Sequence, residues 1–186
     1  MGILREAEGP SAAGVLNEAV QGAPGLGKVL ELLDGVSSQE RAIEAIGRAK
    51  EFVMLFAFTF DRADVAKALL AAHARGRKVS VGVDKRWTLS GKTRGQLSRL
   101  QELVVQGIDM RVLVGTAYDV EHRAVQRSTV AGVGLQRSKA VHTDSGTTVG
   151  SCNFTTASRA HRELGVLLQL EPEEVDVQRH KMGSPN

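Results

Sequence analysis

A strongly basic segment runs from residue 75 to residue 99. It contains eight basic residues against a single acidic residue, Asp84. The basic residues are Arg75, Arg77, Lys78, Lys85, Arg86, Lys92, Arg94 and Arg99. This excess predicts contact with a polyanion, either a nucleic-acid backbone or an anionic phospholipid headgroup. A solvated helix face is the alternative interpretation. The polyanion-binding candidates are Lys85, Arg86, Lys92 and Arg94.

A second candidate for phosphate binding lies near the N-terminus. Residues 22 to 28 have the Gly-x4-Gly-Lys spacing of a P-loop, whose backbone N–H groups surround phosphates. Asp61, after Phe58-Thr59-Phe60, would then supply the acidic strand end. Against this, Val29 stands where magnesium needs a Ser or Thr hydroxyl, and residues 17 to 21 do not have the pattern of a buried strand. A turn is therefore favoured, and nucleotide binding is a distant alternative.

A third group of polar residues begins at Arg137. The order is Arg137-x-Lys139, four residues, Asp144, five residues, then Gly150-Ser151-x-Asn153, with Glu163 further on. This order resembles the signature of the phospholipase D superfamily, which is His-x-Lys, four residues, Asp, about six residues, Gly-Ser-x-Asn. The resemblance extends from about residue 38 to residue 170. The chain is similar to the single-motif members, such as bacterial endonucleases of this type and mitochondrial cardiolipin hydrolase.

The resemblance implies a phosphodiesterase acting on phospholipid or nucleic acid. Lys139, Ser151 and Asn153 would bind the phosphate oxygens, and Asp144 and Glu163 would orient the site. The family mechanism uses a histidine that attacks phosphorus and a second motif's histidine that protonates the leaving oxygen. It implies no metal and no organic cofactor. Because the family site needs two motifs and this chain has one, the expected partner is a second copy, in a homodimer.

The sequence departs from the family at the nucleophile, because Arg137 occupies the histidine position. A guanidinium stays protonated at physiological pH and has no lone pair with which to attack phosphorus. It can still bind phosphate through two parallel hydrogen bonds. The sequence therefore predicts impaired hydrolysis, and a catalytically silent phosphate-binding module is the alternative.

Other nucleophiles are less well placed by the pattern. Strand alternation points Arg137 and Lys139 to one face and His142 to the other, so His142 is expected to be a packed or surface residue. His122 lies in an irregular segment. His161 stands where the family resemblance suggests an Asn, and is interpreted as a structural neighbour of the site. Cys152 is interpreted as a small buried side chain.

The elements that would position this motif follow an α/β pattern. Both faces of residues 52 to 60 are apolar, as in a central strand. Strands and helices then alternate, which predicts a phospholipase D-like α-β-α sandwich with a mostly parallel central sheet. The expected helices are 38–50, 64–76 and 93–107, and the expected strands are 52–60, 79–83, 108–114, 135–142, 147–149 and 164–170.

Composition sets the outer limits. The chain has 186 residues, 24 Lys+Arg against 21 Asp+Glu, and one cysteine, which excludes an internal disulfide framework. The apolar runs are too short for a membrane span, so the expected location is intracellular and cytoplasmic, with peripheral membrane association as an option. The predicted organisation is a loosely ordered arm over 1–36, the domain over 37–170 and a peripheral tail over 171–186.

Overall fold

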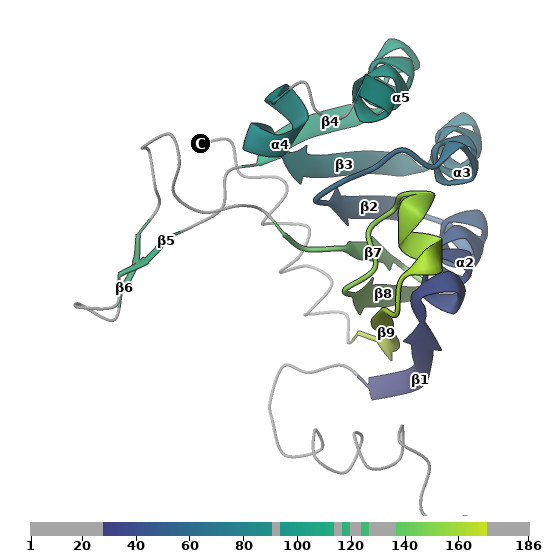
Figure 1. The fold of residues 1–186 in the computed structure, drawn as a ribbon. Coiled ribbons are helices and arrows are strands. Elements are labelled where there is room, and N and C mark those ends of the chain that lie inside the picture. Colours follow the sequence, from purple (N-terminus) through teal and green to yellow (C-terminus); the bar gives the residue numbers. More distant parts are fainter. Residues whose placement is uncertain (1–27, 91–93, 114–116, 120–123, 127–136, 171–186) are drawn as a thin grey trace, which may run out of the picture.

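The computed structural model describes residues 28–90, 94–113, 117–119, 124–126 and 137–170, and these residues form one seven-stranded sheet with helices (Figure 1). The order across the sheet is β1-β9-β8-β7-β2-β3-β4. Its strands are β1 (Lys28–Asp34), β2 (Phe52–Ala57), β3 (Lys78–Asp84), β4 (Asp109–Leu113), β7 (Ala140–Thr143), β8 (Gly146–Gly150) and β9 (Leu164–Gln169). A separate hairpin pairs β5 (Ala117–Asp119) with β6 (Ala124–Gln126).

The helices are α2 (Gly35–Arg48), α3 (Ala63–Ala74), the short α4 (Lys85–Leu89), α5 (Arg94–Val105) and the 3-10 turn η1 (Ala157–Ala160). Strands β2, β3 and β4 are parallel, whereas β7, β8, β9 and β1 continue the sheet in antiparallel pairs. The predicted α/β class is confirmed, and the parallel strands β2, β3 and β4 form one end of the sheet. Among the described helices, α2, α3 and α5 lie together on one side of the sheet (Figure 1).

The main core lies between these helices and one face of β2, β3 and β7. Ile46 of α2, Leu69 of α3 and Leu103 of α5 are fully buried there against Leu55 of β2. The other face of β2 carries a second apolar cluster, Phe52 and Met54, with Phe56 against it. Burial on both faces of β2 confirms the central strand that the sequence predicts. Strand β7 pairs directly with it.

The N-terminal boundary differs from the predicted one, because residues 28–34 form an edge strand instead of a loose arm. Strand β1 pairs antiparallel with β9, and Val29 and Leu33 are buried. The register shifts between Val29 and Glu31, so a bulge interrupts the alternation by which strands are recognised in a sequence. Asp34 then accepts a hydrogen bond from the Ser37 N–H and caps α2 (2.7 Å).

This strand also argues against the P-loop interpretation. Lys28 begins β1, whereas a P-loop lysine lies where a glycine-rich loop enters a helix. Strand β1 is at the sheet edge, separated from β2 and Asp61 by β9, β8 and β7. Residues 22–27 lie outside the described residues, as do His122, Lys92 and the predicted tail 171–186. Within the described ranges, no helix combines the length and apolar character needed to cross a membrane.

Candidate phosphate-binding site

The motif residues meet at the carboxyl ends of the parallel strands, where open α/β sheets bind their ligands. Ala140 of β7 is paired with Phe56 of β2, so Lys139 lies beside the end of β2. The Gly150 N–H donates to the Lys139 carbonyl oxygen (3.1 Å), and the Ser151 N–H donates to the Leu164 carbonyl oxygen (2.9 Å). Strand pairing therefore brings Lys139, Ser151 and the start of β9 to one place.

Gly150 is required for this close approach. A Cβ at position 150 would lie 2.5 Å from the Leu164 carbonyl oxygen and 2.7 Å from the Gly165 Cα. Real Cβ atoms do not come so close, so any other residue here would displace β9. Because Glu163 immediately precedes β9, its carboxylate depends on the same glycine for its position.

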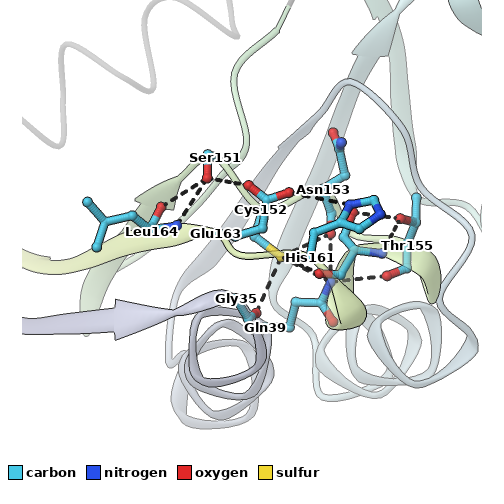
Figure 2. Close-up of polar contacts among 10 residues, drawn as sticks. Gly35, Gln39, Ser151, Cys152, Asn153, Thr155, His161, Glu163 and Leu164 are labelled. Atoms are coloured by element: carbon cyan, nitrogen blue, oxygen red, sulfur yellow. Dashed lines mark hydrogen bonds and ion pairs between the residues drawn. The ribbon is translucent and has the colours of Figure 1, made fainter.

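A carboxylate links the serine of the motif to a histidine (Figure 2). The Ser151 hydroxyl donates to Glu163 Oε2, and the Leu164 N–H donates to the Ser151 Oγ (3.1 Å). On its other side, Glu163 Oε1 lies 3.8 Å from His161 Nδ1. The Glu163 side chain is only 15% exposed, whereas that of His161 is 62% exposed. The site thus joins a serine, a mostly buried carboxylate and an imidazole open to solvent.

Lys139 supplies the cation of the site and lines a small pocket with Gly150 and Cys152. Its Nζ donates to the Arg137 carbonyl oxygen (2.7 Å) and lies 5.4 Å from the centre of the Phe58 ring. Burial, together with the nearby Arg137 charge, lowers the pKa of Lys139, and the Glu163 charge opposes this. A partly desolvated ammonium group gains most from an incoming anion, which suits phosphate binding.

Arg137 lies against an aromatic pair. Its guanidinium carbon is 5.0 Å from the Phe58 ring centre, and the Phe58 and Trp87 ring centres are 5.2 Å apart. Trp87 belongs to α4, whose other residues include the exposed Lys85 and Arg86. Asp84 caps this short helix by accepting from the Trp87 N–H (2.6 Å). The aromatic pair therefore connects the motif to one part of the basic segment.

The basic segment as a whole does not form one surface. Arg75 donates to the carbonyl oxygens of Ile46 and Gly47 at the end of α2 (3.1 Å each), and Arg99 pairs with Glu102 (3.0 Å). Arg75 therefore stabilises the fold, and Arg99 takes part in a surface ion pair. Of the polyanion-binding candidates, Lys85 and Arg86 remain near the site; Lys92 lies outside the described residues, and Arg94 begins α5 without a described side chain.

Gln39 is a site residue that the sequence analysis missed. It is fully buried, and its Nε2 donates to the carbonyl oxygens of Asn153 (2.6 Å) and Thr155 (3.1 Å). Its Oε1 accepts a hydrogen bond from Arg62, which is also buried. Gln39 thus holds the backbone that carries Asn153. The available signal was an amide on the apolar face of α2, one turn before Ala42, where an uncompensated polar group is costly.

The two side chains after Ser151, those of Cys152 and Asn153, differ in their hydrogen bonding. Cys152 is buried, its Sγ donates to the Gly35 carbonyl oxygen (3.3 Å), and burial raises the pKa of its thiol. These features agree with its interpretation as a small buried side chain. The amide oxygen of Asn153 is buried and has no hydrogen-bond partner among the described residues. An amide left in this state can reorient toward a bound group.

Asp144 does not join the site. Strand β7 (Ala140–Thr143) separates it from Lys139, so Asp144 lies at the opposite end of the β7–β8 hairpin. There it accepts hydrogen bonds from the N–H groups of Lys50 and Glu51 (3.0 Å each). Burial favours the protonated acid, but these N–H groups outweigh it and lower the pKa of Asp144. Its direct contacts connect the β7–β8 turn to the loop before β2, so its influence on the site passes through β7.

His142 is placed as strand alternation predicts. Val141 faces the main core, whereas His142 lies on the other face of the sheet against Phe56, with ring centres 5.6 Å apart. Its Nδ1 is 3.0 Å from the Thr147 Oγ1, and the residue is buried. The geometry separates His142 from Lys139 by the thickness of the sheet, which removes it as a candidate nucleophile.

Comparison with known proteins supports these assignments at the level of family and fold. Residues 42–180 match the family described as cardiolipin synthase, PLD-like domain. No curated protein matches the chain. Among solved structures, the chain is similar to the phospholipase D family member Nuc from Salmonella typhimurium, with 22% identity and a TM-score of 0.63, over 81% of this chain and 90% of Nuc.

Two further structures share the fold. NucT from Helicobacter pylori matches at 18% identity and a TM-score of 0.59, over 81% of this chain and 91% of NucT. The archaeal chromatin protein TrmBL2, whose structure is described as showing a novel mode of DNA binding, matches at 15% identity and a TM-score of 0.51, over 90% of this chain and 56% of TrmBL2. The chain belongs to the phospholipase D superfamily, in the family of PLD-like cardiolipin synthase domains.

Proposed function

We propose that this chain is a phospholipase D-type phosphodiesterase that binds a phosphodiester between Lys139, Ser151 and Asn153. The observation that carries the proposal is the convergence of these residues at the carboxyl ends of the parallel strands, beside Glu163. The partly buried ammonium of Lys139 supports it, because this group can donate to phosphate oxygens, as the Nδ2 group of Asn153 can.

In this proposal, the residue at position 137 does not act as the nucleophile. Arg137 takes the place of the nucleophilic histidine, and its guanidinium lies over Phe58. A permanently charged guanidinium binds an anion but does not attack phosphorus. We therefore expect the unmodified chain to bind phosphate analogues and to turn over phosphodiesters slowly.

The decisive experiment restores the family residue. Arg137→His should raise the hydrolysis of bis(p-nitrophenyl) phosphate about 100-fold or more, since general nucleophilic or acid–base groups contribute factors of this size. Adding Lys139→Ala should remove the gain, because the developing charge loses its cation. Arg99→Lys, which keeps the charge paired with Glu102 away from the site, is the matched control.

The binding-module alternative predicts a different result. If Arg137→His stays inactive although it binds vanadate and melts like the unmodified chain, the pocket has lost its catalytic geometry and only binding remains. If neither form binds vanadate or phosphate, and Lys139→Ala makes no difference, the proposed site is wrong.

The substrate and the assembly belong to the same proposal. The family description names cardiolipin synthase and TrmBL2 is described with DNA, so cardiolipin vesicles and single-stranded DNA are the two substrates to compare. The Arg137→His variant should prefer one of them by at least tenfold in rate. A homodimer would complete the site with a second motif, and light scattering should then give twice the chain mass. A monomer that still hydrolyses diesters would refute the dimeric site.

A further inference from the structure

Glu163 is placed to orient an imidazole, although position 137 carries an arginine. In an acyl- or phosphoryl-transfer site, a buried carboxylate next to an imidazole orients the ring and stabilises the charge that develops on it. Glu163 is mostly buried and accepts from Ser151, yet the residue in the family's nucleophile position is an arginine. The imidazole that faces Glu163 in this chain comes from another position.

That imidazole is His161. Its Nδ1 lies 3.8 Å from Glu163 Oε1, while Glu163 Oε2 accepts the hydrogen bond from Ser151 (Figure 2). A single carboxylate therefore contacts a phosphate-binding candidate on one side and the ring on the other. The distance is longer than a hydrogen bond, and such contacts tighten when a substrate is bound.

The backbone and the exposure of His161 also suit a reacting group. Its N–H donates to the Ser158 carbonyl oxygen (3.3 Å) at the end of η1, and two residues later the chain reaches Glu163 and β9. The backbone is thus anchored on both sides, but 62% of the side chain is exposed, so the ring is accessible to an incoming substrate. The Glu163 charge also acts on Lys139, so the carboxylate that faces His161 lies near the cation of the site.

We propose that His161, oriented by Glu163, is the nucleophile of this chain, replacing the histidine that is missing at position 137. The inference rests on the proposed function, since it needs a phosphodiester held by Lys139 and Ser151. With the ring proton on Nδ1, facing Glu163, the lone pair of Nε2 attacks phosphorus. The N–P bond forms, the P–O bond to the leaving alcohol breaks, and the alkoxide takes a proton from water.

The second half of the reaction returns the enzyme. The hydroxide left by that water attacks phosphorus, the N–P bond breaks, and its electron pair returns to Nε2. One diester and one water give one monoester and one alcohol. With bis(p-nitrophenyl) phosphate the first leaving group departs as p-nitrophenolate, which needs no proton, so this compound tests the nucleophile separately from any general acid.

The experiment traps the covalent intermediate on the full chain. The protein is mixed with bis(p-nitrophenyl) phosphate and quenched in alkali, in which a phosphorus–nitrogen bond to histidine survives, and the adduct is located by peptide mass spectrometry. We expect an adduct on His161 that is lost in acid. His161→Asn should abolish it and lower p-nitrophenolate release about 100-fold. Glu163→Gln should slow adduct formation. His73→Gln, at the distant end of α3, is the matched histidine control and should change neither.

Vanadate binding separates failure of this inference from failure of the proposed function. If vanadate binds but no adduct forms, or if the adduct persists in His161→Asn, His161 is not the nucleophile and the phosphate site stands. If vanadate does not bind and Lys139→Ala has no effect, the phosphate site itself is wrong, and the assignment of His161 falls with it.

Discussion

The two ends of the β7–β8 hairpin carry the two halves of one sequence motif, and they differ in how their polar groups are partnered. At one end, Lys139 lines a pocket with Gly150 and Cys152, and the amide oxygen of Asn153 has no partner among the described residues. At the other end, the Asp144 carboxylate accepts from consecutive backbone N–H groups. Unpartnered groups are available to a ligand, whereas saturated groups stabilise the fold. The motif therefore combines a binding half with a structural half.

The sharpest test of this contrast is expected from the binding half. Ser151→Ala removes a hydroxyl of the motif and should weaken vanadate binding about 10- to 100-fold, the range for a hydrogen bond to a charged ligand. The thermal midpoint should fall only slightly, because Ser151 is exposed although its hydroxyl contacts Glu163 and the Leu164 N–H. Isothermal titration and a thermal melt on the same sample measure both. A large drop in the melting temperature with unchanged affinity would reverse the assignment.

A substitution of Asp144, in the structural half of the motif, should lower stability and leave vanadate affinity nearly unchanged. Asp144→Ala leaves backbone N–H groups without their acceptor and should lower the free energy of unfolding by about 1 kcal/mol, a value reduced for the exposure of this carboxylate. Vanadate affinity should change less than twofold. Urea unfolding and titration are the measurements, and a selective loss of affinity would contradict the structural role.

Acid should remove the same contribution from the unmodified chain. The pKa of Asp144 is lowered in the folded protein, so its stabilisation is complete above the ordinary aspartate pKa of about 4 and declines as the pH falls toward the folded value. The pKa of Asp34 is lowered too, by its helix-capping hydrogen bond. Asp34 is present in both proteins, so its contribution cancels. The difference in free energy of unfolding between the unmodified chain and Asp144→Ala therefore reports on Asp144 alone. That difference should shrink in urea titrations from pH 6 to pH 3.

The smallest effect is expected from the neighbouring basic helix α4. Lys85 and Arg86 are exposed and adjoin the Trp87–Phe58 pair, so they extend the binding half toward a longer polyanion. Replacing both with Ala should reduce the salt dependence of single-stranded DNA or anionic vesicle binding, by about one unit of logarithmic slope per lost phosphate contact. Stability should change by less than about 0.5 kcal/mol. An unchanged slope would assign both residues to a solvated surface.

Local pattern was enough to predict most of the fold. The alternation in residues 52–60 and 79–83 identified β2 and β3, because side-chain direction in a strand has a period of two residues. The same alternation correctly separated His142 from Lys139. The family signature located the loop from Gly150 to Asn153, and the comparisons confirm the family. The catalytic and binding roles of these residues stay predictions.

Where the pattern was interrupted, prediction failed. The bulge between Val29 and Glu31 interrupts the alternation that would have predicted β1. Gln39 was missed because its hydrogen-bond partners, among them the Asn153 carbonyl oxygen, lie far away in the sequence. Helix α2, capped by Asp34, begins at Gly35, three residues before the expected start at residue 38. For β1 and Gln39 the missing information was a contact with a distant part of the chain.

The sequence by itself determined the class of fold, the order of the motif residues and the presence of an arginine at position 137, since these depend on residue type, spacing and strand alternation. Only the tertiary structure decided which motif residues share a site. Pairing between β7, β8 and β9 brings Glu163 to Ser151 and Lys139, and it leaves Asp144 at the far end of the strand. The physical reason is that strand pairing joins residues far apart in the chain, and spacing along the chain does not specify those partners.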